Sequence, residues 1–112
     1  GSFTNVKAIY EDNQQVQSST IKTKVLGNYP NPFNPTTSIE FDLEKYDYVK
    51  LIIYDINGRH IKTLADSHFS TGTHKFIWNA LDDYGSKVSS GVYIYRLISS
   101  DNILTKKMLL LK

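Results

Sequence analysis

Cysteine is absent from this chain of 112 residues. Its absence excludes disulfide scaffolds, thiolate zinc sites and cysteine nucleophiles, but a domain of this size can fold outside the cell without a disulfide, so the compartment stays open. An excess of one charge is also lacking, because 13 basic and 11 acidic residues give a net charge of only +2. Lys106, Lys107 and Lys112 form the only local basic group, so we predict no nucleic-acid partner.

Long apolar runs are missing too. The longest one, Met108–Leu111, is far shorter than the roughly 20 residues that cross a bilayer, so we expect no membrane span. The chain does contain 40% hydrophobic and 12% aromatic residues, a composition that is typical of a folded, sheet-forming protein. Its length predicts one core and one domain.

Apolar and polar residues alternate along most of the chain, and no long window keeps the 3.6-residue period of a helix. We expect strands over residues 38–43, 48–56, 59–65, 73–80, 92–99 and 103–111, with a short additional strand over 21–26. Asn57–Gly58 favours a type I′ hairpin turn, and Asp66–Gly72 is expected to be a longer connection. Short strands with frequent turns must bury their faces against one another, which predicts an all-β, antiparallel sandwich of about seven strands. The predicted core consists of Ile39, Phe41, Val49, Leu51, Ile53, Phe76, Trp78, Tyr93, Tyr95 and Leu97.

The N-terminal part is expected to lie outside the domain. Gly1–Ser2 resembles a cloning remnant, Phe3–Tyr10 has a short apolar pattern, and Glu11–Thr20 is almost entirely polar. We interpret residues 1–25 as this remnant followed by a linker or the end of a preceding domain, and residues 26–112 as the folded domain.

All three prolines lie within six positions, in the run Asn28–Pro35. Each proline fixes φ and lacks a backbone donor, which predicts a stiff, extended lead-in to the strands that follow. The rings of Tyr29 and Phe33 lie among the prolines and are expected to dock on the domain. The amides of Asn31 and Asn34 are expected to close Asx-turns.

Residues with catalytic or metal-binding chemistry form no recognisable constellation. His60, His68 and His74 lie in or beside predicted turns without the spacing of a zinc site, so we interpret them as surface residues. Asp82–Asp83 with Gly85 weakly resembles a calcium loop, but the other ligands are missing, and turn formation is the favoured interpretation. We therefore predict no catalytic residue, no metal, no cofactor and no enzyme activity.

Four tyrosines are expected to be exposed, namely Tyr46, Tyr48, Tyr54 and Tyr84. They are either a sugar-stacking platform or, as we favour, ordinary residues of a tyrosine-rich sheet.

The chain ends in a lysine-flanked apolar strand, Lys106–Lys112. A terminal strand at a sheet edge is a template for pairing with another extended segment, which predicts recognition by β-augmentation. The alternative, that it is simply the last strand of the fold, is compatible with this role.

These segments together resemble the Por-type C-terminal sorting domain of the type IX secretion system of Bacteroidetes, which is similar to the Ig-like domain of flagellar hook-cap proteins. The matching segments are Asn28–Ile39, Val49–Arg59, Gly72–His74, Trp78, Asp83–Gly85, Ser90–Leu97 and Lys106–Lys112.

The resemblance implies an Ig-like sandwich that acts as a secretion signal. It implies a cargo domain earlier in the same chain, passage through the periplasm, and delivery to the cell surface or the medium by the outer-membrane translocon and a sortase-like peptidase. The domain itself is expected to be a monomer. The residues that it assigns to sorting and partner binding are Pro30, Asn31, Pro32, Phe33, Gly91, Tyr93, Lys106, Lys107, Met108, Leu109, Leu110, Leu111 and Lys112.

A second function remains open from the sequence alone. An Ig-like sandwich with exposed tyrosines is also compatible with a structural spacer or a carbohydrate-binding accessory module of a secreted hydrolase.

Overall fold

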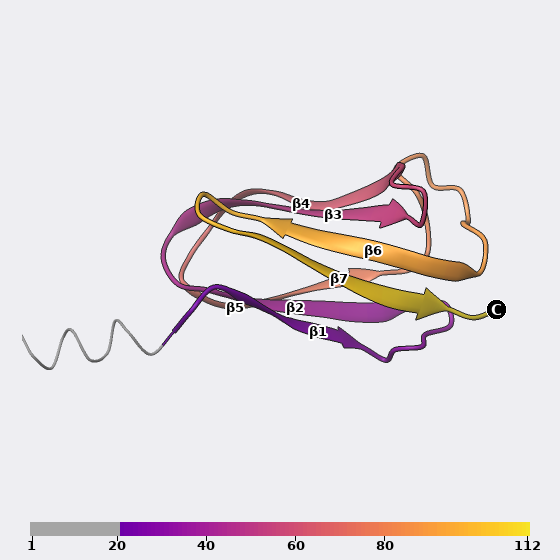
Figure 1. Cartoon of the computed structure of the whole chain (residues 1–112), viewed down its shortest axis with the longest axis horizontal. Coiled ribbons are helices and arrows are strands. Elements are labelled where there is room, and N and C mark those ends of the chain that lie inside the picture. Colours follow the sequence, from indigo (N-terminus) through magenta and orange to yellow (C-terminus); the bar gives the residue numbers. More distant parts are fainter. Residues whose placement is uncertain (1–20) are drawn as a thin grey trace, which may run out of the picture.

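Two antiparallel sheets pack face to face in residues 21–112, which are the residues that the computed structural model describes (Figure 1). One sheet has the strand order β1-β2-β5 and the other β4-β3-β6-β7. This arrangement confirms the predicted Ig-like, all-β sandwich of about seven strands. Predictions for Phe3–Tyr10 and Glu11–Thr20 lie outside the described residues. The strands are β1 (Lys24–Tyr29), β2 (Thr37–Leu43), β3 (Asp47–Asp55), β4 (His60–Phe69), β5 (Gly72–Trp78), β6 (Gly91–Ile98) and β7 (Ile103–Leu110).

The period-two pattern decides which face of each strand is buried. In β2, Ile39, Phe41 and Leu43 are fully buried, while the residues between them lie on the outer face. The central strands β3 and β6 of the other sheet follow the same rule and point every second side chain at β2 and β5. Two sheets with one apolar face each can hide both faces only by stacking, which produces the sandwich.

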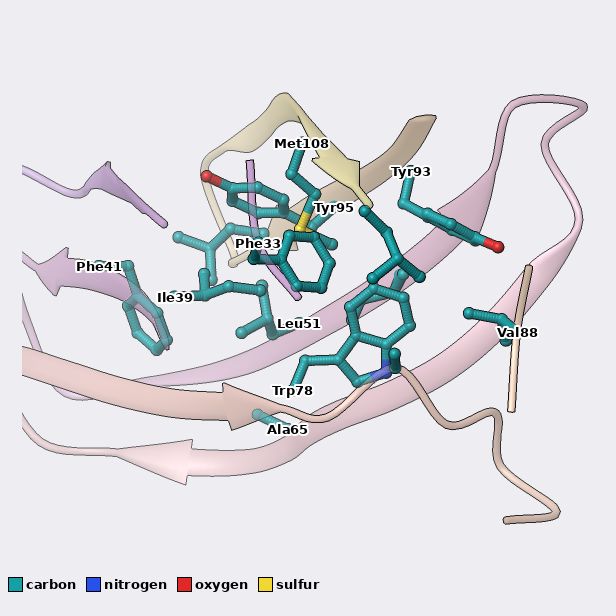
Figure 2. Close-up of a cluster of buried hydrophobic side chains, with 14 of the residues drawn as sticks. Phe33, Ile39, Phe41, Leu51, Ala65, Trp78, Val88, Tyr93, Tyr95 and Met108 are labelled. Atoms are coloured by element: carbon teal, nitrogen blue, oxygen red, sulfur yellow. The ribbon is translucent and has the colours of Figure 1, made fainter. Parts of the chain in front are cut away.

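The core lies between the sheets, and its aromatic part is shown in Figure 2. The predicted core residues are buried except Phe76, which is half-buried because β5 is an edge strand. Its ring stacks on Phe41 at a centroid distance of 6.0 Å and covers the core from the rim. The buried hydrophobic residues outside the predicted core list are Phe33, Leu43, Ala65, Ala80, Val88, Met108 and Leu110.

Trp78 is the largest fully buried side chain. Its indole N–H donates a hydrogen bond to the carbonyl oxygen of Leu81 at 2.8 Å, so its one polar atom is satisfied inside the core. The ring centroid lies 5.7 Å from that of Phe33 and 5.3 Å from that of Tyr93. Trp78 therefore joins the two sheets and the proline run in one aromatic cluster.

The hairpin between β3 and β4 is present, but its predicted type I′ turn is wrong. Gly58 has a φ of +85°, whereas Asn57 does not take a positive φ, which a type I′ turn requires. The N–H of Gly58 donates to the carbonyl of Asp55 at 3.0 Å, and Asp55 Oδ1 accepts the N–H groups of Asn57 and Arg59 at 2.9 Å each. This carboxylate holds a type I turn followed by a left-handed glycine.

The predicted connection over Asp66–Gly72 is also wrong, because β4 continues to Phe69 and only Ser70 and Thr71 separate it from β5. Asp66, Ser67 and His68 of this extension are polar and exposed because β4 is an edge strand. The polar residues at the end of this edge strand therefore gave the pattern of a loop.

The sheet also starts earlier than the proline pattern suggested. The short strand expected over 21–26 is β1, which runs from Lys24 to Tyr29 and pairs with β2. A register shift between Val25 and Gly27 carries the strand past the glycine. The first strand of the fold thus precedes the prolines.

Replacing Trp78 by Ala should lower the free energy of unfolding by about 3–5 kcal/mol, because it removes the centre of the aromatic cluster and leaves a cavity. Urea denaturation followed by circular dichroism measures this. Tyr84→Ala is the control, since that ring is 93% exposed and its loss should change stability by less than about 0.5 kcal/mol. Equal effects of the two substitutions would contradict the central role of Trp78.

Acid should weaken the β3–β4 hairpin. The backbone N–H of Arg59, then its side chain and the N–H of Asn57, hold the pKa of the Asp55 carboxyl below its usual range. A group whose pKa is lower in the folded state contributes stability above its unfolded pKa, and this contribution is lost as pH falls through the folded pKa. Asp55→Asn should therefore make unfolding in urea less sensitive to pH below about pH 4. A Glu44→Gln variant is the exposed control, and parallel pH profiles for Asp55→Asn and the parent chain would refute the assignment.

Candidate functional site

The residues Pro30–Pro35, called the proline segment below, connect β1 to β2 and lie against the outer edge of β7. The segment is a series of bends around one bridging residue, Phe33, rather than the extended lead-in that was predicted. All three peptide bonds that precede its prolines are cis. The N–H of Phe33 donates to the carbonyl of Leu109 at 3.0 Å, and the N–H of Leu111 donates to the carbonyl of Phe33 at 2.9 Å. A connection of one sheet thus pairs with the last strand of the other.

Asn31 adds a third bond to the same edge. Its Oδ1 accepts the backbone N–H of Leu109 at 3.0 Å, so the side chain binds β7 and does not close the predicted Asx-turn. Leu109 consequently has both of its outward main-chain groups satisfied by the proline segment. We call these three bonds the clamp.

Phe33 anchors the clamp in the core. Its ring is 2% exposed and packs against Trp78, which confirms the predicted docking of this residue. The same prediction is wrong for Tyr29, whose side chain is 82% exposed. The register explains the difference: Tyr29 pairs with Ser38 and shares its outward-facing side of the sheet.

The base of the proline segment is closed by a polar network. Asn28 Nδ2 donates to Thr37 Oγ1 at 3.1 Å, and the Thr37 hydroxyl donates to the carbonyl of Pro30 at 2.8 Å. The hydroxyl of Tyr95 donates to Asn28 Oδ1 at 3.2 Å and ties β1 to β6 across the sandwich. Burial raises the pKa of Tyr95 to about 12, so it remains a neutral donor at physiological pH. Sequence reasoning missed Asn28 and Thr37; an Asn that precedes a proline run and a Thr that follows it were the available signals.

Gly91 and Tyr93 lie on the other side of β7 from the clamp. Gly91 pairs with Leu110 and Tyr93 with Met108. Gly91 has a φ of +147°, a conformation that other residues rarely adopt. The hydroxyl of Tyr93 donates to the carbonyl of Ser89 at 2.6 Å, which holds the chain where β6 begins. The proline segment, the start of β6 and the end of β7 therefore meet at one place, which we call the corner.

The lysines predicted to act in sorting are divided between two places. Lys106 and Lys107 are exposed and lie away from the corner, where they pair with Tyr95 and Ile94. Lys112 folds back to the corner, and its Nζ donates to the carbonyl of Val88.

The edge of β7 is only partly open for pairing. Alternate residues of an antiparallel strand direct their main-chain groups toward the neighbouring strand and away from it. Leu109 and Leu111 direct theirs at the proline segment, so the expectation of an open template at the end of the strand is wrong at these positions. By the same alternation, the unbroken register with β6 directs the main-chain groups of Ile103, Thr105 and Lys107 to the open side.

The other candidate residues do not assemble into a site. Residues 82–86 form the favoured turn, in which Asp82 Oδ1 accepts the N–H groups of Tyr84 and Ser86 at 2.9 Å each. Within residues 21–112, no group of three or more His, Cys, Asp or Glu side chains could hold a metal ion. No helix in this part of the chain is long and apolar enough to cross a membrane.

The four tyrosines predicted to be exposed do not form one platform, and the prediction is wrong for Tyr54, which is half-buried. The rings of Tyr46 and Tyr48 contact His68 near the start of β3, at centroid distances of 5.2 and 5.0 Å. Tyr54 lies near the far end of the same strand, beside His60 and under the guanidinium of Arg96.

Comparison with known proteins gives a consistent family. A family profile described as "Secretion system C-terminal sorting domain" matches residues 28–111. No curated protein matches the chain.

Solved structures share the fold at low sequence identity. Dimeric latent PorU from Porphyromonas gingivalis has 22% identity and a TM-score of 0.66 over 83% of this chain and 10% of its own. PorZ, a surface component of the type-IX secretion system of the same organism, has 23% identity and a TM-score of 0.53, and the match covers 80% of this chain and 11% of the PorZ chain. FlgD from P. aeruginosa has 20% identity and a TM-score of 0.54, and the match covers 66% of this chain and 57% of the FlgD chain. The chain thus spans about a tenth of the PorU and PorZ chains.

Replacing Asn31 by Ala should expose the edge of β7 at one amide. The N–H of Leu109 loses its acceptor and should exchange with solvent deuterium much faster, whereas the N–H of Leu111 keeps its bond to Phe33. Native-state hydrogen exchange by NMR resolves the two amides. Asn34→Ala, in the same segment, should leave both unchanged, and unchanged protection of Leu109 in Asn31→Ala would show that the amide does not close this edge.

Proposed function

The chain belongs to the family of C-terminal sorting domains of the type IX secretion system, and we propose that the translocon recognises it at the corner and along the adjoining open edge of β7. The observation that supports this proposal most directly is the clamp, in which Asn31 and Phe33 form hydrogen bonds with Leu109 and Leu111. A secretion signal must present a defined surface without catalysing a reaction. The corner joins three distant parts of the sequence, so this surface exists only when the domain is folded.

The open edge of β7 supplies the pairing site. The clamp occupies Leu109 and Leu111, and the strand order leaves no strand beyond Ile103, Thr105 and Lys107. An extended segment of a translocon component would add to this edge through main-chain hydrogen bonds. The exposed ammonium groups of Lys106 and Lys107 flank it and would favour an acidic segment.

The proposal has further parts, which rest on the membership of the family of sorting domains. The domain is a non-catalytic monomer that is preceded by its cargo. Residues 1–25 supply a linker or the end of that cargo, where a sortase-like peptidase separates the two. The cargo passes through the periplasm and reaches the cell surface or the medium. A structural or carbohydrate-binding module of a secreted hydrolase is a weaker description of the whole domain, because the family is one of sorting signals.

A fusion experiment tests the proposal. Residues 21–112 attached to the C-terminus of a reporter with a periplasmic signal peptide should bring the reporter to the surface of a type IX host. Removal of Met108–Lys112 should abolish display, because it removes the end of β7 that the clamp holds. Display that is unaffected by this deletion would overturn the role of the corner, and retention of the complete fusion in the periplasm would overturn the sorting function.

A single proline substitution in β7 can distinguish a loss of edge pairing from a loss of folding. Thr105→Pro removes an N–H that faces the open side, where the fold tolerates proline, and should reduce display while the domain stays folded. Thr105→Ala keeps the N–H and should be displayed like the parent chain. Thermal unfolding of the purified domains checks that both variants fold. Full display of a folded Thr105→Pro variant would show that the translocon does not pair with this edge.

A further inference from the structure

The outer face of the three-stranded sheet carries a hollow that the sorting function does not use. Directly opposed residues of an antiparallel pair share a face, so Tyr29, Ser38 and Ile77 form one row across β1, β2 and β5. Gly27, Glu40 and Lys75 form the next row. Both rows face away from the core. The sheet that carries them lies below the other sheet in Figure 1.

Gly27, which has no side chain, lines a hollow on this face. Gly27 has a φ of +125° at a register shift of β1, and nothing lies within 4 Å of the position that a Cβ would take. The hollow has a volume of about 340 Å³ and is also bordered by Leu26, Tyr29 and Lys75. This volume is within the range of small-ligand sites, which is roughly 300–1,000 Å³.

The polar groups in this hollow are free to bind a ligand. Glu40 and Lys75 are directly opposed, yet among the described residues neither side chain takes part in an ion pair or a side-chain hydrogen bond. The next row differs, because the Thr73 hydroxyl donates to Asp42 Oδ1 at 2.6 Å. A carboxylate, an ammonium group and the Ser38 hydroxyl therefore face solvent together beside an aromatic ring.

We propose that this hollow is a binding site for a neutral carbohydrate chain, with Tyr29 as its stacking ring. The ring is 82% exposed and Leu26 is 45% exposed, so both offer apolar surface to the C–H face of a sugar. Glu40 accepts hydrogen bonds from sugar hydroxyls, and Lys75 donates to them. The two charges balance, which favours a neutral ligand over an anionic one.

The site is separate from the sorting surface. It lies on the outer face of β1, β2 and β5, whereas the clamp lies on the edge of β7. Tyr29 and Glu40 make none of the bonds of the clamp. A glycan and a translocon segment could therefore be bound at the same time, and loss of one would leave the other intact.

Titration of the ¹⁵N-labelled domain with neutral hexasaccharides tests the proposal. Cellohexaose, xylohexaose, mannohexaose and chitohexaose are the probes. At least one should shift the amides of Leu26, Gly27 and Lys75 in a saturable manner. No saturable shift with any probe, or shifts confined to other parts of the domain, would overturn the proposal.

Matched variants assign the binding to the hollow. Tyr29→Ala should weaken binding at least about tenfold, and Glu40→Gln should weaken it to a smaller extent. Tyr84→Ala removes a ring that is 93% exposed elsewhere and should bind like the parent chain. Because Tyr29 is exposed, its variant should stay folded, and thermal unfolding checks this. Equal affinity of Tyr29→Ala and the parent chain, or saturation of the same amides by an acidic hexapeptide instead of a sugar, would overturn the carbohydrate assignment.

Discussion

The pairing of Phe33 with the end of β7 is the constraint on which the rest of this domain depends. Its ring is an anchor in the core, and burial of such a side chain contributes about 1.5–3 kcal/mol. Its backbone makes two hydrogen bonds to Leu109 and Leu111. One residue of a connection in the three-stranded sheet thereby fixes the edge of the four-stranded sheet. Two stacked sheets share no ladder, so contacts of this kind determine how they are aligned.

The same pairing also protects an edge of the four-stranded sheet. An unprotected edge strand invites association with other chains, and a terminal strand with apolar residues on both faces is especially prone to it. Asn31 and Phe33 cover that edge where the strand is most apolar and leave the more polar part at Thr105 and Lys107 open. Partial covering of the last strand protects its most apolar part from association and leaves the rest of the edge for the pairing that we propose.

Much of the architecture could be read from the alternation of residues, but edges and turns could not. Ile39, Phe41 and Leu51 follow a simple period and were placed in the core, where they lie. The end of β4 was missed because an edge strand has little reason to alternate. The turn at Asn57–Gly58 was assigned the wrong type because the Asp55 carboxylate, two residues before it, stabilises another conformation.

The sequence by itself determined the sandwich, the family and the identity of the important segments, because these depend on local periodicity and on motifs with a fixed order. Only the tertiary structure decided what the segments do. It separated Phe33, which is buried, from Tyr29, which is exposed. Position in the fold makes this choice: Tyr29 pairs with Ser38 on the outer face of its sheet, whereas Phe33 is held against the end of β7 with its ring in the core. Contacts between residues as distant as Asn31 and Leu109 leave no local trace, and they become visible only when the two sheets are stacked.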